Sequence, residues 1–372
     1  MSASRVGLVA EWLRSGLQIR APRFDSGRGL QPHFPGGAAI GVPMDKDEQT
    51  ATAPLHGGDL TFARQLYGEP AGGWLDLSTG INPRPYPLPP FDPALLSRLP
   101  DRTALADLVA TARRLYGAPD NVAMTAVPGT EVALRLLPSA LPQGAVAIVS
   151  PTYPSHADAW RRGSHMVVEV ADADAIPADA RFVVVTNPNN PDGRTHEPDQ
   201  LAGLARQLAE RGGVLVVDEA FGDVEPRASL MPFLDRAPAV VLRSFGKFFG
   251  LPGLRLGFFA GPPPIVDRIT QLFGDWPVSS HAIAAARIAL ADIPWRDQTR
   301  ERLQQDTKAL RALLARHSLR IVGGTNLFTL VGHTDAGLIH QALARHGIWT
   351  RVFPYRRDWL RVGLPAIDRR LC

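Results

Sequence analysis

The chain has 372 residues, 45% of them hydrophobic, and a formal net charge of +4. That length suffices to bury a substantial core, and we expect a large domain together with a smaller one. Residues 1–43 hold five arginines against two acidic residues, a surplus of +3, so the rest carries about +1 and is not a basic nucleic-acid binder.

The cysteine content and the apolar runs exclude further classes of protein. Cys372 is the only cysteine, so no intrachain disulfide can form and no cysteine-based zinc site is supported. We expect no metal site and a cytoplasmic location. No apolar run approaches the roughly 18 residues of a membrane span, so no membrane association is predicted.

Residues 1–53 are interpreted as a leader that is disordered or results from a misassigned start. The leader is rich in arginine and poor in acidic residues, a composition that is also compatible with a transit peptide. Met44 precedes a charged run and then a conventional globular sequence, so a start there is the alternative. Residues 54–100 are predicted to contribute to the active site and to the small domain.

Residues 101–262 are predicted to form the large domain, because short β-rich runs alternate there with amphipathic stretches. Such alternation is typical of an α/β fold with a mostly parallel sheet flanked by helices. Helices are expected at 103–116, 130–141 and 199–211. The expected strands are 121–127, 145–150, 165–170, 181–186, 213–218, 239–244 and 255–260.

Residues 263–372 are predicted to form a smaller α+β domain. After three consecutive prolines at 262–264 the pattern changes to long helices, including one at 295–316. Strand-like pieces follow at 319–322, 327–331, 348–353 and 359–362.

A single lysine, Lys247, stands among small and hydroxyl residues after the strand that ends at Ser244, and Arg255 follows eight residues later. A lysine amine becomes a carbonyl nucleophile when its surroundings lower its pKa. A hydroxyl and a guanidinium nearby are suited to a phosphate. These residues are therefore candidates for binding an aldehyde cofactor that carries a phosphate, although a lysine beside glycine is usually a solvated loop charge.

Other candidate residues also follow predicted strands, at the sheet edge where open α/β folds bind ligands. Asp218 is suited to a cationic ring nitrogen, or alternatively to capping a helix. Gly129 and Thr130 open a helix, where backbone N–H groups attract anions. Asn190 is a hydrogen-bond donor or part of a tight loop, and Tyr153 stacks on a flat ring or simply packs.

Taken in chain order, these motifs resemble those of the fold-type-I, class I/II aminotransferase superfamily, over about residues 54–365. The resemblance implies pyridoxal 5'-phosphate (PLP) covalently attached to Lys247, with Asp218 at the pyridine nitrogen. It further implies Asn190 at the ring oxygen, a stacked Tyr153, and a phosphate site formed by Gly129, Thr130, Ser244 and Arg255. The fold that it implies is a seven-stranded large domain with a smaller C-terminal domain.

Within this superfamily the chain looks like the threonine-phosphate decarboxylases of cobalamin biosynthesis. The resemblance lies in the segments 56–59, 76–83 and 359–365, and in Phe221 and Asp192, where many transaminases have Tyr and Thr. It implies a homodimer that acts on a phospho-amino acid. The implied substrate contacts are His56, Gly57, Asn82, Asn190, Arg351 and Arg361.

Three functions follow as hypotheses. The first is decarboxylation of L-threonine O-3-phosphate, and the second is transamination of histidinol phosphate by a related class I/II transaminase. Motifs alone leave the two open, because PLP breaks whichever Cα bond lies perpendicular to its ring. A PLP-binding regulatory protein is the third, disfavoured because residues 1–53 are too short and lack the periodicity of a helix-turn-helix module.

Overall fold

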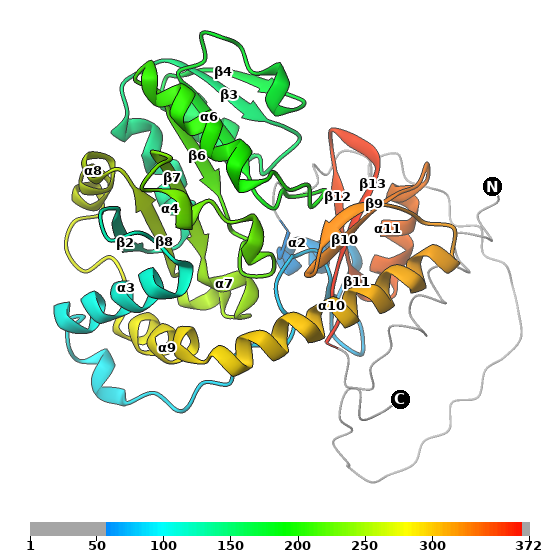
Figure 1. Ribbon diagram of the computed structural model, residues 1–372. Coiled ribbons are helices and arrows are strands. Elements are labelled where there is room, and N and C mark those ends of the chain that lie inside the picture. Colours follow the sequence, from blue (N-terminus) through cyan, green and yellow to red (C-terminus); the bar gives the residue numbers. More distant parts are fainter. Residues whose placement is uncertain (1–56, 367–372) are drawn as a thin grey trace, which may run out of the picture.

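The computed structural model describes residues 57–366. The predictions for the leader and for His56 lie outside this range. The described chain contains one seven-stranded sheet, one four-stranded sheet and a two-stranded pair. Figure 1 shows the larger sheet with its helices beside the smaller sheet, with helix α10 (Ile293–Arg316) extending along both.

The seven-stranded sheet has the strand order β2-β8-β7-β6-β5-β3-β4. Neighbours from β4 to β7 run parallel, whereas β8 is antiparallel to both β7 and β2. The central strands are valine-rich and fully buried, as expected for strands covered on both faces. The bounds are β2 Ala123–Val127, β3 Ala145–Val149, β4 Met166–Val170, β5 Phe182–Thr186, β6 Val214–Asp218, β7 Ala239–Ser244 and β8 Gly257–Gly261.

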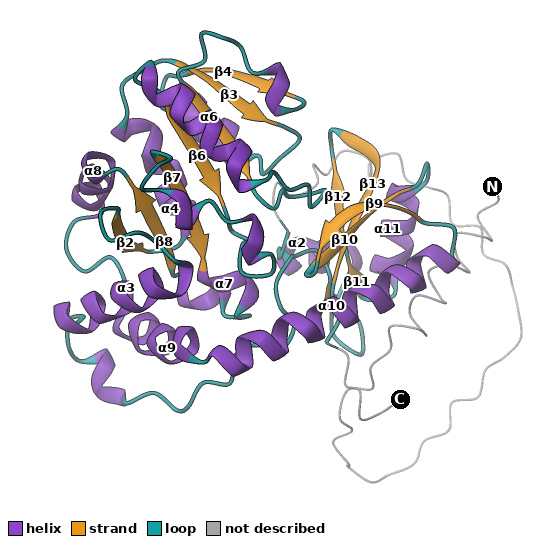
Figure 2. Ribbon diagram, in the orientation of Figure 1, coloured by secondary structure: helices purple, strands orange, loops and turns teal. Residues whose placement is uncertain are grey.

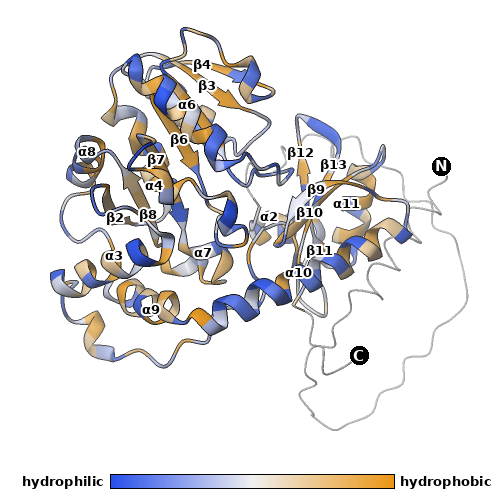
Figure 3. Cartoon of the chain, viewed as in Figure 1, coloured by the Kyte–Doolittle hydropathy of each residue, from blue (hydrophilic) through white to orange (hydrophobic). Residues whose placement is uncertain are grey.

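Alternate side chains of these strands enter two hydrophobic cores, one on each face of the sheet. In β6, for example, Leu215 and Val217 enter one core and Val216 enters the other. One face is covered by α3 (Arg102–Tyr116), α6 (Pro198–Glu210) and α9 (Ser280–Ala291), and the opposite face by α4 (Thr130–Leu136), α5 (Ser155–Arg162) and α8 (Pro263–Phe273). Figure 2 shows these helices around the sheet, and Figure 3 shows its strands as predominantly hydrophobic.

The smaller unit is an antiparallel sheet of order β12-β13-β10-β9, packed against α10 and α11 (Ala336–Arg345). In it, Arg351 and Arg361 are cross-strand partners. The strands are β9 Arg320–Thr325, β10 Phe328–Gly332, β12 Arg351–Phe353 and β13 Arg356–Gly363.

The N-terminal segment joins the C-terminal part of the chain. Helix α2 (Leu60–Tyr67) contacts α11, and β1 (Leu75–Asp76) pairs in parallel with β11 (Ile348–Trp349). The remaining elements are single turns: α7 Phe245–Phe248, η2 Pro93–Leu96, η3 Leu137–Ala140, η4 Ala173–Ala175, η5 Pro226–Ala228, η6 Met231–Phe233 and η7 Pro252–Leu254.

The predicted fold class is confirmed, and all seven strands of the large sheet lie within two residues of their predicted ends. One predicted strand, 348–353, is wrong: it is split into β11 and β12, which pair with different partners, β1 and β13. The predicted strand 255–260 begins only at Gly257, because Arg255 adopts a left-handed conformation with φ of 51°. The predicted domain boundaries stay a prediction.

Candidate active site

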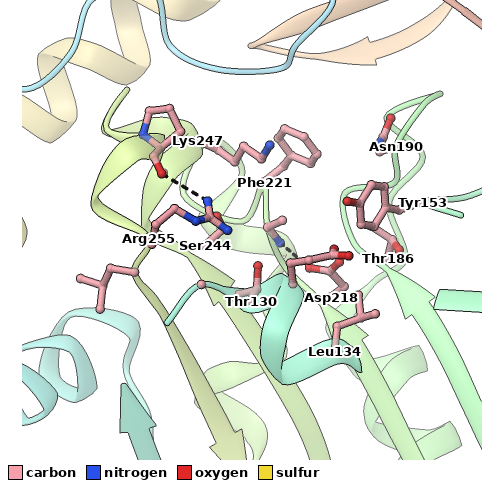
Figure 4. A pocket seen from close by; sticks show the side chains of 16 residues that line it. Thr130, Leu134, Tyr153, Thr186, Asn190, Asp218, Phe221, Ser244, Lys247 and Arg255 are labelled. Carbon is pink, nitrogen blue, oxygen red and sulfur yellow. Dashed lines mark hydrogen bonds between the residues drawn. The ribbon is translucent and has the colours of Figure 1, made fainter. Parts of the chain in front are cut away.

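All eight residues predicted to contact the cofactor line one cavity of about 310 Å³ (Figure 4). They come from loops and turns that follow the strands, because the parallel strands end at the same edge of the sheet. The cavity lies over this edge. These residues are Gly129, Thr130, Tyr153, Asn190, Asp218, Ser244, Lys247 and Arg255.

One end of the cavity is cationic and rich in hydroxyl groups. The left-handed backbone of Arg255 turns its guanidinium against Gly129, where an added Cβ would lie 2.9 Å from Nη2. Nη1 of Arg255 donates to the carbonyl of Pro252 over 3.2 Å. Thr130 and Ser244 line the same cavity as this guanidinium. A guanidinium with two hydroxyls is a donor set suited to a phosphate.

The opposite part of the cavity holds a buried carboxylate. Asp218 is 5% exposed, and its Oδ1 accepts from the backbone N–H of Ala220 over 3.0 Å. Its Oδ2 lies 3.1 Å from Nε2 of His156, which is 1% exposed. The histidine therefore fixes the orientation of the carboxylate. Tyr153 packs edge-on against His156, and burial raises the pKa of the Tyr153 phenol to about 12.

Lys247 extends into the cavity toward Phe221, with Nζ 6.0 Å from the centre of that ring (Figure 4). Burial lowers the pKa of the Lys247 amine to about 8, and the positive charges of Arg361 and Arg255 act in the same direction against Asp218. About a tenth of such amines are uncharged at neutral pH, compared with a negligible fraction at the ordinary lysine pKa. The amine is thereby a better nucleophile.

Asn190 connects the cavity to the small sheet. Its Oδ1 accepts a hydrogen bond from Nη1 of Arg361, and Nη2 of Arg361 donates to the carbonyl of Ser78 over 2.6 Å. Because Arg361 uses the amide oxygen, the amide nitrogen of Asn190 is the group oriented to donate elsewhere. Arg361 also lies over the ring of Phe328, 5.0 Å from its centre.

Arg351 and Arg361 form a pair of like charges, 8% and 6% exposed, on adjacent strands. Burial lowers the pKa of both side chains, and Arg351 adds to the effect on Arg361, whose pKa falls to about 10. The two positive charges repel one another. An anion placed between the guanidiniums would relieve this repulsion and accept hydrogen bonds from both.

The other predicted substrate contacts occupy different surroundings. Gly57 packs against the Ser78 carbonyl that Arg361 uses, since an added Cβ would come within 2.3 Å of that oxygen. Asn82 is 2% exposed and bonds to the carbonyl of Phe248 and to Arg302. Neither residue lines the cavity.

Sequence reasoning missed three residues of this site. His156 lies three residues after Tyr153, at the start of α5, a helix that the sequence pattern did not predict. Thr186 ends β5 and lines the cavity, and its hydroxyl lies 2.8 Å from that of Thr152. Ser78 acts through its backbone carbonyl, for which no sequence signal exists.

The donor set fits PLP. The amine of Lys247 suits the aldehyde, Asp218 the ring nitrogen, and the end of the cavity at Arg255 the phosphate. The phenol ring of Tyr153 and the amide nitrogen of Asn190 suit the flat ring and its oxygen. Within residues 57–366 no cluster of three or more potential metal ligands occurs, and no helix in that range has the length and apolarity to span a membrane.

The family model described as aminotransferase class I and II matches residues 96–372. A threonine-phosphate decarboxylase from Sinorhizobium sp. is 41% identical over 337 residues, which cover 86% of this chain and 97% of that protein. One from Pseudomonas aeruginosa is also 41% identical, covering 84% and 93%. A histidinol-phosphate aminotransferase from Geobacter sp. is 28% identical, covering 78% and 87%.

Solved structures share the fold at lower identity. The histidinol-phosphate aminotransferase from Sinorhizobium meliloti, in complex with PLP, superposes with a TM-score of 0.68 at 19% identity, covering 88% of this chain and 94% of that one. The L-threonine-O-3-phosphate decarboxylase from Porphyromonas gingivalis gives 0.66 at 18% identity, covering 79% and 94%. The chain belongs to the aminotransferase class I and II family and has its fold-type-I architecture.

Proposed function

We propose that this chain is a PLP-dependent carboxy-lyase that converts L-threonine O-3-phosphate to (R)-1-amino-2-propanol O-2-phosphate and CO₂ in cobalamin biosynthesis. The observation that carries the proposal is the 41% identity to two threonine-phosphate decarboxylases over 84–86% of the chain. Histidinol-phosphate aminotransferases, which represent the alternative function, are less similar: that of Geobacter sp. is 28% identical over 78% of the chain, and that of Nocardia farcinica is 33% identical over 69%.

PLP, when bound, supplies an electron sink for the electron pair left on the substrate's Cα as one of its bonds breaks. We assign its attachment to Lys247, whose amine has a pKa lowered to about 8 by burial. Arg255, Gly129, Thr130 and Ser244 bind its phosphate in this assignment.

Asp218 holds a negative charge at the position that we assign to the protonated ring nitrogen. Its two oxygens are held by the Ala220 N–H and by His156, so the carboxylate cannot rotate away from the cavity. A fixed carboxylate there keeps the ring nitrogen protonated, which strengthens the electron sink. His156 is a positioning residue for Asp218.

The substrate carries two anionic groups, a carboxylate and a phosphate, and the chain offers two buried arginines on adjacent strands. We assign Arg361 to the α-carboxylate and Arg351 to the phosphate. Gly57, Asn190 and Asn82 remain proposed contributors to this part of the site.

The reaction breaks the bond between Cα and the carboxylate carbon, CO₂ leaves, and Cα takes up one proton. Lys247 provides the only amine among the described residues that line the cavity, so we assign it to deliver that proton. If Arg361 holds the α-carboxylate as assigned, its position would favour cleavage of the bond to the carboxylate carbon over loss of the hydrogen on Cα.

The test is to incubate purified protein with PLP and L-threonine O-3-phosphate, without any 2-oxo acid, and to measure released CO₂. We expect continuous release with an equal amount of the phosphorylated amino alcohol. Absence of CO₂ together with substrate consumption that requires an added 2-oxo acid, or turnover of histidinol phosphate alone, would favour the transaminase. Borohydride followed by peptide mass spectrometry should place the reduced cofactor on the peptide that contains Lys247.

We further propose a homodimer in the cytoplasm. The family resemblance supports the dimer, and the lack of any cysteine before Cys372 supports a reducing compartment. Sedimentation of the active protein at the mass of a single 40.2 kDa chain would contradict the dimer.

A further inference from the structure

The single helical turn that carries Lys247 is too short to be stable by itself. Helix α7 has four residues, Phe245–Phe248, and a helix that short is unstable in isolation. The last carbonyls of any helix also lack donors within the helix. The position of the Lys247 backbone therefore depends on hydrogen bonds from other segments.

Beside the N–H of Gly250, which lies 3.4 Å from the carbonyl of Lys247, the donors come from one short stretch of the N-terminal segment. The backbone N–H of Asn82 donates to the carbonyl of Lys247 over 2.9 Å, and its side-chain Nδ2 donates to the carbonyl of Phe248 over 2.8 Å. The N–H of Tyr86 continues the series to the carbonyl of Phe249 over 2.8 Å. Three consecutive carbonyls at the end of α7 are thus bound from residues 82–86.

The other side of the Asn82 amide is fixed by α10. Its Oδ1 accepts from Nη2 of Arg302 and from the N–H of Arg84, each over 3.0 Å. With both donors on the oxygen, Nδ2 can face only the Phe248 carbonyl. Helix α10 also packs against β9 and β10 of the small sheet, so one amide links the Lys247 turn to a helix that supports the small sheet (Figure 1).

The packing around Asn82 leaves no room for a substrate. Asn82 is 2% exposed, and an added Cβ on Gly250 would lie 2.7 Å from its carbonyl oxygen. Every polar atom of its side chain already has a protein partner at good distance. These contacts argue against the direct substrate contact that the sequence suggested.

We propose that Asn82 is a positioning residue that places Lys247 for reaction by holding the carbonyls at the end of α7. The inference deepens the proposed function and concerns its lysine. It predicts that loss of the Asn82 amide weakens cofactor attachment and slows turnover while leaving substrate affinity nearly unchanged.

The test compares Asn82→Asp and Asn82→Ala with the wild type, all as the full chain. Asn82→Asp keeps an oxygen for Arg302 and Arg84 but removes the donor to Phe248, whereas Asn82→Ala removes all side-chain bonds. Tyr86→Phe is the matched control, since it loses only the Tyr86 hydroxyl bond to Asp292 and keeps the backbone N–H bond to Phe249.

Two measurements are made without substrate. The first is PLP affinity by absorbance titration of the cofactor-free protein. The second is the pH dependence of Lys247 acylation, read by mass spectrometry, which is simple because Lys46, Lys247 and Lys308 are the only lysines. We expect both Asn82 variants to bind PLP about tenfold or more weakly, roughly the effect of one lost hydrogen bond, and to shift the acylation profile to higher pH. Tyr86→Phe should match the wild type in both.

Steady-state kinetics then separate positioning from substrate contact. We expect kcat to fall at least about tenfold with KM within about twofold of the wild type. A raised KM with unchanged PLP affinity and an unchanged acylation profile would overturn the proposal and restore the substrate contact. If the Asn82 variants do not fold, Arg302→Met replaces them, and wild-type PLP affinity in that variant would also overturn it. The PLP-binding and acylation measurements do not require CO₂ release. Failure of the proposed role of Asn82 can therefore be told apart from failure of the proposed function.

Discussion

Replacing Lys247 by methionine should stabilise the cofactor-free protein in a pH-dependent way. The pKa of this amine falls from 10.5 to about 8, first because of burial and then because of Arg361. The folded state therefore binds fewer protons than the unfolded state between these two values, and its stability rises with pH across them. Below pH 8 both states are charged, and the folded state bears the whole cost of the buried ammonium.

The size of this cost follows from the shift. A drop in pKa from 10.5 to about 8 corresponds to about 3 kcal/mol. The residue keeps some contact with solvent, which screens the charge, so we expect roughly 1 to 3 kcal/mol. Lys247→Met removes the charge and should gain that amount at neutral pH. The gain should shrink between pH 8 and 10.5 and disappear above pH 10.5, where the amine is uncharged in both the folded and the unfolded wild type.

Urea unfolding of the cofactor-free proteins at a series of pH values measures this difference directly. Lys308→Met is the matched control, because this lysine is exposed on α10 and its replacement should change stability by less than about 0.5 kcal/mol. A gain that is the same at every pH would mean that packing of the methionine, not the buried charge, causes it. A loss of stability at neutral pH would refute the reasoning.

Three further substitutions test the residues proposed to bind or position the cofactor and the substrate. His156→Phe leaves the buried Asp218 carboxylate without its side-chain partner and should weaken PLP binding by about 1–3 kcal/mol, measured by cofactor titration. Gly129→Ala adds a Cβ 2.9 Å from Arg255 Nη2 at a φ of 86°, so PLP affinity should fall at least about tenfold with the fold retained by circular dichroism. Arg361→Lys keeps the charge but loses the planar fork, and kcat/KM for L-threonine O-3-phosphate should fall about tenfold or more in steady-state kinetics.

The large sheet and the cofactor cavity were predictable because local patterns determine both. Strands β5 and β6 are valine runs that no amphipathic helix would contain, and their ends carry Asn190 and Asp218 within a few residues. Parallel strands bring those ends together whatever the details of the loops. Eight residues from six separate motifs therefore met in one cavity without any knowledge of the packing.

Long-range pairings escaped prediction, since a local pattern does not name its partner. The run 348–353 looks like one strand, but its first residues pair with β1 from the N-terminal segment and its last residues with β13. The predicted strand 319–322 stops before Gly323 and Gly324, yet both belong to β9. They are needed there because a Cβ on Gly323 would lie 2.1 Å from the carbonyl of Asp192.

The same limit applies to Asn82 and His156, whose roles depend on neighbours far along the chain. Asn82 bonds to residues 166 and 220 positions away, and His156 to one 62 positions away. The family resemblance implied a substrate contact for the first, and the sequence indicated nothing for the second. Only the packed structure distinguishes a side chain that lines a cavity from one that lies behind it and positions the lining residues.

One hydrogen bond joins the proposed cofactor contact Asn190 to the proposed substrate contact Arg361. The loop that carries Asn190 is also tied to the small sheet, because the N–H of Gly324 donates to the carbonyl of Asp192 over 2.6 Å. A shift of the small sheet would therefore move both contacts together. If Arg361 binds the substrate carboxylate as proposed, we expect the contact between the two sheets to influence how the substrate is held, and thereby the choice between decarboxylation and transamination.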